Sequence, residues 1–157
     1  MNRRKWPVYP AFIAGTEAVG ALSGWLTRGG AERYAHLIVK PSLSPPAPVF
    51  PAVWAALFAL LGAGAARVWL APAGPARTRA LGMFGVQLAF NFCWSLIFFN
   101  AGAYGFALLW LAALWGLILW MLLAFRKVDR PAAWMQLPYL LWVSFAAYLN
   151  FGVWALN

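Results

Sequence analysis

Residues 103–125 read AYGFALLWLAALWGLILWMLLAF, a stretch without a charged side chain that ends at the basic pair Arg126-Lys127. A helix needs about 20 apolar residues to cross a hydrocarbon layer about 30 Å thick, so this stretch predicts a transmembrane helix. Comparable runs lie outward from it, at 8–26, 49–70, 81–99 and 133–155. The chain is therefore expected to be an all-α membrane protein, one domain over residues 1–157 built as a bundle of five transmembrane helices.

The composition agrees with a lipid environment. Of the 157 residues, 64% are hydrophobic and 10% are charged, whereas a soluble domain is about a quarter charged. The net charge of +9 does not indicate a nucleic-acid partner, because the basic residues occur in small groups between apolar runs and form no basic face. A multi-pass protein of the lipid bilayer is the expected class.

Basic residues also predict the orientation, because cytoplasmic loops keep an excess of Lys and Arg. Arg28, Arg33 and Lys40 fall on one side of the five spans, and the other nine fall on the side of the N-terminus, which is therefore expected to be cytoplasmic. Those nine are Arg3, Arg4, Lys5, Arg67, Arg77, Arg79, Arg126, Lys127 and Arg130.

Few side chains could carry catalysis or hold a metal. The one cysteine, Cys93, and the one histidine, His36, are far apart in the sequence, and the acids Glu17, Glu32 and Asp129 are scattered. The sequence therefore predicts no disulfide, no metal site and no catalytic residue. Glu17 lies inside the first span, where either a proton relay or an interhelical hydrogen bond from a neutral carboxyl would explain it.

The long connection at 27–48 contains the run KPSLSPPAP at residues 40–48. Proline fixes φ and lacks an N–H donor, so this run cannot be helical and should be stiff and extended. Irregular backbone near a membrane is tolerated where it covers a cavity. The loop is expected to be a lid, and a solvated linker is the alternative.

Three helical faces could form a ligand pocket. The second span carries aromatic residues at i, i+4 and i+8, the third carries a polar stripe beside a tryptophan, and the fifth carries rings beside a small residue. Polar side chains in a membrane normally face the bundle interior. The faces predict an apolar pocket with polar anchors, although aromatic stripes at this spacing also arise from plain packing. They consist of Phe50, Trp54 and Phe58; Gln87, Asn91, Trp94 and Ser95; and Trp142, Phe145, Ala146 and Leu149.

Small residues on the third span predict a contact between two copies of the chain. Gly85 and Ala89 are four residues apart, and such pairs allow two helices to approach closely in a membrane. A homodimer through this helix is expected.

Three stretches resemble the signature sequences of the TspO/translocator protein family. They are Lys40-Pro41 with Pro45-Pro46 and then VFPAVW at 49–54, QLAFNFCWSLIFF at 87–99, and LPYLLWVSFAAYLN at 137–150. The resemblance covers nearly the whole chain. It implies a five-helix bundle, often a homodimer, that binds porphyrins and related tetrapyrroles beneath the first loop.

The resemblance also implies the site. Positions that match the family's pocket, together with Tyr34 of the first loop and Phe145 of the aromatic face, give the candidate ligand-binding set. The set is Tyr34, Pro45, Phe50, Trp54, Phe58, Asn91, Trp94, Leu111, Leu114, Trp142, Phe145, Ala146 and Leu149.

The chain departs from the family at several positions. Arg33 precedes Tyr34 where the family usually has a tryptophan, and Leu43 stands where another tryptophan is usual. Tryptophan-dependent breakdown of porphyrin in light is therefore less expected. The sterol-recognition stretch of animal members is also missing, because Phe151 stands in place of a tyrosine and no basic residue follows Arg130.

The resulting hypothesis is a receptor or sensor in a bacterial cell membrane. It would bind a tetrapyrrole, as ligand and not as cofactor, in a pocket between the first, second, third and fifth helices. Two alternatives remain: a transporter of porphyrins or other small lipophiles, and an enzyme that degrades porphyrin in light.

Overall fold

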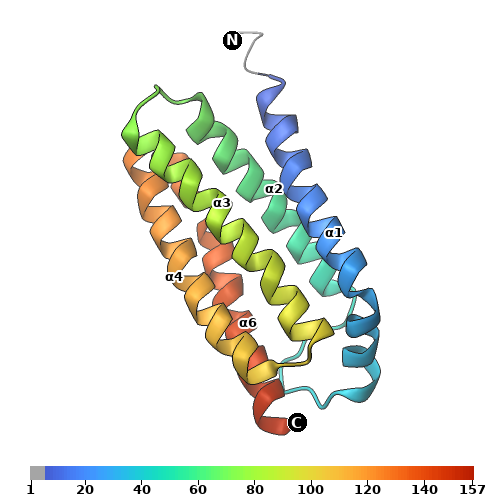
Figure 1. Cartoon of the computed structure of the whole chain (residues 1–157). Coiled ribbons are helices and arrows are strands. Elements are labelled where there is room, and N and C mark those ends of the chain that lie inside the picture. Colours follow the sequence, from blue (N-terminus) through green and yellow to red (C-terminus); the bar gives the residue numbers. More distant parts are fainter. Residues whose placement is uncertain (1–5) are drawn as a thin grey trace.

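The computed structural model describes residues 6–157, which form a bundle of five long helices (Figure 1). The long helices run alternately in opposite directions, so the two ends of the chain lie at opposite ends of the bundle. The all-α fold predicted from the apolar runs is confirmed. Its elements are α1 (Val8–Leu37), α2 (Val49–Leu70), α3 (Pro75–Ser95), the π-helical turn η2 (Leu96–Asn100), α4 (Tyr104–Val128), the short α5 (Arg130–Trp134) and α6 (Leu137–Leu156).

Four segments are long and apolar enough to cross a membrane. They are α2, α3 with η2, α4, and α5 with α6, and their mean hydropathy lies between 1.4 and 2.3. α1 does not reach the same measure within the described residues, so the span expected at 8–26 stays a prediction. Its buried residues are small, Thr16, Ser23, Thr27 and Gly30, and the charged side chain of Glu17 lowers the hydropathy of the first span further.

The expected end of the first helix at residue 26 is wrong, because α1 continues to Leu37. The stretch from 27 to 37 contains no proline and includes Ala31, Glu32 and Ala35, which favour a helix. The helix ends before Pro41, where the ring disfavours helical backbone in the preceding residue. The irregular lid segment is therefore 38–48, half the expected length.

Other helix ends differ less from expectation. α3 begins at Pro75, because proline suits the first turn of a helix, where its missing N–H is not needed. The last apolar run, expected as one helix over 133–155, is divided at Met135-Gln136 into α5 and α6. Gly102, with φ of 61°, makes the tight turn from η2 into α4.

α1 and α2 pack with their backbones close together. A Cβ atom added at Gly62 would lie 2.7 Å from the Ile13 Cα and 2.8 Å from the Phe12 carbonyl oxygen. The Thr16 hydroxyl donates a 2.8 Å hydrogen bond across the contact to the Phe58 carbonyl. Close approach gives van der Waals contact and interhelical hydrogen bonds, which replace the hydrophobic driving force that is missing between helices in lipid.

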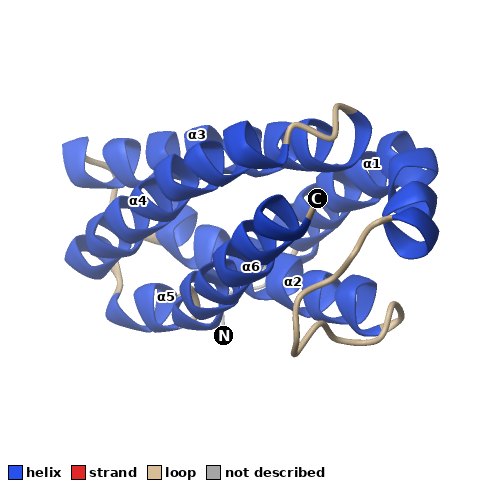
Figure 2. Ribbon diagram, turned by 90° about the horizontal axis from the view of Figure 1, so that it is seen from below, coloured by secondary structure: helices blue, strands red, loops and turns tan. Residues whose placement is uncertain are grey.

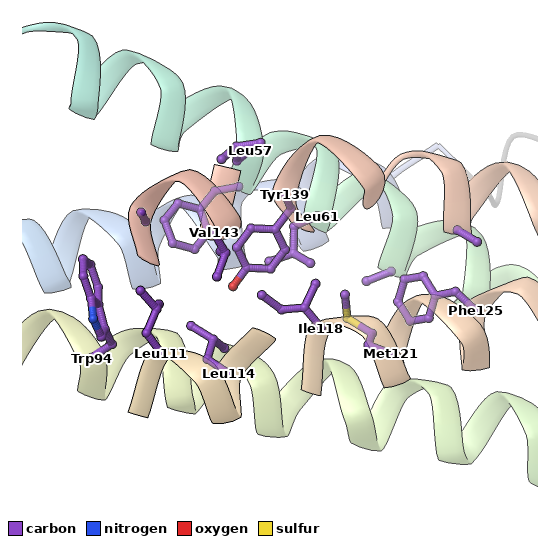
Figure 3. Packing of buried hydrophobic residues seen from close by; sticks show 14 of the residues in the cluster. Leu57, Leu61, Trp94, Leu111, Leu114, Ile118, Met121, Phe125, Tyr139 and Val143 are labelled. Carbon is purple, nitrogen blue, oxygen red and sulfur yellow. The ribbon is translucent and has the colours of Figure 1, made fainter. Parts of the chain in front are cut away.

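The apolar core lies between α2, α4 and α6. Tyr139 and Val143 of α6 face Leu57 and Leu61 of α2 on one side and the buried row of α4 on the other (Figure 3). The α4 row is spaced at three and four residues, as one helical face requires. It consists of Leu111, Leu114, Ile118, Met121 and Phe125, each with at most 1% of its surface exposed.

Asp129 joins α2 to the turn between α4 and α5. Its carboxylate accepts two hydrogen bonds from the Arg67 guanidinium, at 2.9 and 3.0 Å, and a third from the Ala132 amide at 2.7 Å. The last bond caps the N-terminus of α5. The Arg67 guanidinium lowers the pKa of the Asp129 carboxyl below its ordinary value.

Replacing Asp129 with alanine should lower the thermal midpoint of unfolding more than replacing it with asparagine. Alanine removes the helix cap and the ion pair, together about 1–2 kcal/mol, whereas asparagine keeps a cap and loses only the partly exposed pair. Because the folded pKa is lowered, the pair stabilises above the unfolded pKa and its contribution is lost as pH falls through the folded value. Unfolding scans at descending pH should show the wild type converging on the asparagine variant, and equal midpoints for both variants at neutral pH would contradict this account.

Candidate functional site

Aromatic rings from α2 and α6 meet between the two helices. The Trp54 ring lies 5.7 Å from that of Phe58, 6.2 Å from Tyr139 and 6.5 Å from Trp142, centroid to centroid. The second and third of these pairs are edge-to-face, a geometry that aromatic pairs prefer, and the first is tilted. We refer to the set as the aromatic cluster, which consists of Phe50, Trp54, Phe58, Tyr139, Trp142 and Phe145.

Helical spacing explains why these rings share a face. The α2 members are four residues apart and the α6 members are three residues apart, so each set lies along one side of its helix. α1 approaches the cluster with a glycine, because a Cβ atom at Gly20 would lie 2.7 Å from the Phe58 ring. Phe50, Trp54, Trp142 and Phe145 are half-buried, so part of each residue stays accessible.

Two polar residues of α3 hold the Tyr139 hydroxyl. The Asn91 amide donates to this oxygen over 2.8 Å, and the hydroxyl donates to the Gln87 side-chain oxygen, also over 2.8 Å. All three residues are buried, with at most 3% of each exposed. The polar stripe of α3 therefore faces the bundle interior, as its sequence pattern predicted. Tyr139 belongs to the aromatic cluster but not to the predicted site residues, although its spacing of three residues from Trp142 was a usable signal.

The Trp142 indole carries a buried polar atom without a partner. Its Nε1 is covered by the protein, yet it makes no hydrogen bond within the described residues. A buried N–H left unsatisfied costs about 1–3 kcal/mol. An acceptor atom brought into the aromatic cluster by a ligand would remove that cost.

Tyr34 and Trp94 lie in a second aromatic group, beside η2. Tyr34 packs on Phe98 and Phe99 with centroids 5.5 and 5.6 Å away. Trp94 stacks on Phe98 at 5.1 Å and donates its indole N–H to the Asn150 side chain over 3.2 Å. The structure therefore divides the predicted rings between two places.

The remaining candidate positions are mostly interior. Leu111 and Leu114 are fully buried in the α4 row of the core (Figure 3). Ala146 and Leu149 are buried on α6, one and two turns beyond Trp142. Pro45 is half-buried within the lid segment.

The lid segment, residues 38–48, is attached to the second half of α6 (Figure 2). The Tyr148 hydroxyl donates to the Ser42 carbonyl over 2.9 Å, and Val39 exchanges two hydrogen bonds with the Asn157 side chain, at 2.9 and 3.0 Å. Tyr148 also stacks on Phe145, with centroids 6.1 Å apart. The lid is thereby connected to the aromatic cluster, while Leu43 points outward with 79% of its surface exposed.

Two open cavities of the structure lie away from the aromatic cluster. One, of about 690 Å³, adjoins Gly30, Arg33 and Asn100, and the other, of about 520 Å³, adjoins Ala76 and Arg130. Within the cluster the rings contact one another, so a flat ligand would have to lie on their accessible faces or move them. The pocket predicted there remains a prediction.

The expected dimer face is open. Gly85 and Ala89 are exposed on α3, and a Cβ atom at Gly85 would meet nothing within 4 Å.

Within the described residues no group of three His, Cys, Asp or Glu side chains lies close enough to hold a metal ion.

The helices run alternately in opposite directions and enclose buried aromatic rings and polar side chains. These features define a multi-pass helical membrane protein rich in tryptophan. The TspO/MBR family profile matches residues 12–155, and the chain belongs to this family. It is 39% identical over 142 residues to the tryptophan-rich protein TspO of Chlorobaculum tepidum, covering 89% of each chain. It is 34% identical to the tryptophan-rich sensory protein of Cereibacter sphaeroides, covering 97% of this chain and 92% of that one. The translocator protein of Bos taurus is 32% identical over 88% of this chain and 83% of its own.

Proposed function

We propose that this protein is a membrane receptor or sensor that binds a tetrapyrrole, or a similar flat hydrophobic molecule, at the aromatic cluster. The unpartnered indole N–H of Trp142 carries the proposal, because it is a buried donor among half-buried rings. Binding would consist of ring burial and stacking with one hydrogen bond to an acceptor on the ligand, and would need no covalent step.

Several features support this choice of ligand. Stacked or edge-on aromatic pairs contribute about 0.5–1.5 kcal/mol beyond the area they bury, so several rings favour a large planar molecule. The Tyr139 hydroxyl is fixed by Gln87 and Asn91, which keeps one wall of the cluster in place. The lid segment is attached beside the cluster and would cover a bound ligand.

Titration with protoporphyrin tests the proposal directly. Added protoporphyrin should quench the tryptophan fluorescence of the purified chain in lipid nanodiscs. The quenching should reach a plateau at about one porphyrin per chain. Empty nanodiscs measured in parallel correct for porphyrin that partitions into lipid. Uptake that rises linearly and equals that of empty nanodiscs would contradict a binding site.

Transport is the second candidate, because animal relatives bear the name translocator protein. Sealed proteoliposomes should then accumulate porphyrin faster than protein-free vesicles.

Light-dependent degradation of porphyrin is the third candidate function, and new absorbing products under illumination would identify it. The outward position of Leu43, where the family usually has a tryptophan, makes degradation the weaker proposal.

The assembly and orientation belong to the same proposal. The protein would sit in a bacterial cell membrane with its N-terminus in the cytoplasm, because most of its basic residues lie on that side. It would form a homodimer through the exposed small residues Gly85 and Ala89 of α3.

A further inference from the structure

A basic groove opens at the end of the bundle where α3 begins and α4 ends. Its volume is about 520 Å³, and three helices contribute to its lining. Half of the lining residues are cations and none is an acid. The groove is lined by Ala76 and Arg79 of α3; Trp120, Leu123, Ala124, Arg126 and Lys127 of α4; and Arg130 of α5.

The positive charges of the groove are not neutralised within the described part of the chain. Asp129 lies between Lys127 and Arg130 in the sequence, but its carboxylate is engaged by Arg67. The side chains of Arg79, Arg126, Lys127 and Arg130 make no hydrogen bond or ion pair among residues 6–157. Four neighbouring cations that line one concave surface attract anions.

An apolar wall extends from the cations toward the middle of the bundle. Trp120 and Leu123 are 58% and 47% exposed, and both precede Arg126 on α4. At 1.5 Å per residue, Trp120 lies about 10 Å deeper than Lys127. The groove thus matches a phospholipid: its cations lie at the level of the phosphate, and its apolar surface lies at the level of the acyl chains. A free phosphate ion would use only the cations.

We propose that the basic groove binds an anionic phospholipid with two phosphate groups in its headgroup. Basic pockets between transmembrane helices suit such headgroups, and four cations exceed what a single phosphate would neutralise. The topology rule requires only that cations lie on one side of the membrane. It does not require residues from three helices to line one cavity beside an exposed tryptophan. This inference is independent of the porphyrin proposal.

Native mass spectrometry of the purified full chain tests the assignment, with cardiolipin as the probe. The wild type should retain one cardiolipin per chain, and Arg79→Gln/Arg130→Gln should weaken this binding about tenfold or more. This pair spares Arg126 and Lys127, which stabilise the C-terminus of α4. Both replaced side chains are exposed, so the thermal midpoint should be unchanged.

The control, Arg28→Gln/Arg33→Gln, removes the same charge at the opposite end of the bundle. Because these arginines donate to the Trp25 and Asn100 carbonyls, its thermal midpoint is measured alongside. It should leave cardiolipin binding as in the wild type. An equal loss in both variants would show a general charge effect and overturn the proposal. So would equal retention of phosphatidylcholine, or displacement of cardiolipin by inorganic phosphate at an equal concentration.

Discussion

Trp54→Leu/Trp142→Leu should bind protoporphyrin at least about tenfold more weakly than the wild type. Leucine keeps apolar bulk at both positions but removes two stacking faces, each about 0.5–1.5 kcal/mol, and the indole N–H donor, about 0.5–1.5 kcal/mol. A loss of 1.4 kcal/mol is already tenfold in affinity. Because other tryptophans remain, the fluorescence titration in nanodiscs still reports binding in this variant.

The matched control replaces two exposed tryptophans, Trp25 and Trp134, with leucine. These rings are 60% and 71% exposed and lie outside the aromatic cluster, so the affinity should not change. Trp142→Phe keeps one aromatic ring and removes the indole N–H together with part of the ring area, so it should weaken binding less than the double variant. Equal affinity of the wild type and the Trp54/Trp142 double variant would place the ligand elsewhere.

Gly62→Ala should clearly destabilise the protein, although it adds only one methyl group. The added methyl would meet the backbone of α1 at Ile13 and Phe12 and the Thr16 hydroxyl at 2.6 Å, so one helix must shift. Overpacking of this kind typically costs about 1–3 kcal/mol. The shift would also lengthen the hydrogen bond from Thr16 to Phe58. A lower thermal midpoint in detergent measures the effect.

Gly116→Ala is its control on α4, where an added Cβ atom meets nothing within 4 Å. Alanine favours a helix over glycine by up to about 1 kcal/mol, so this midpoint should stay the same or rise. If both alanine variants changed the midpoint equally, the effect would come from helix propensity and not from the close approach of α1 and α2.

The sequence predicted the helices well because each apolar run must be long enough to cross lipid, and that length is read directly from residues such as 103–125. The end of α1 could not be predicted in this way. Residues 27–37 are polar enough for a loop and also free of proline, and contacts such as the hydrogen bond from Arg33 to the Asn100 carbonyl hold them helical. Propensity and tertiary contact prevailed over polarity.

Periodicity predicted which residues share a face of one helix. It placed Phe50 and Trp54 on one face of α2, and Trp142 and Phe145 on one face of α6. It could not predict which faces meet. Tyr34 and Trp94 pack beside η2, because a turn of π-helix after Ser95 brings Phe98 and Phe99 between them. That turn has no signal in hydrophobic spacing.

Neighbouring rings of α6 connect the aromatic cluster to the lid segment. Trp142, Phe145 and Tyr148 touch in sequence, and the last of them holds the Ser42 carbonyl. The only side-chain path from the Trp142 indole to the lid bond among these contacts therefore runs along α6, and a Tyr148→Phe variant would remove its last link, the bond to the Ser42 carbonyl.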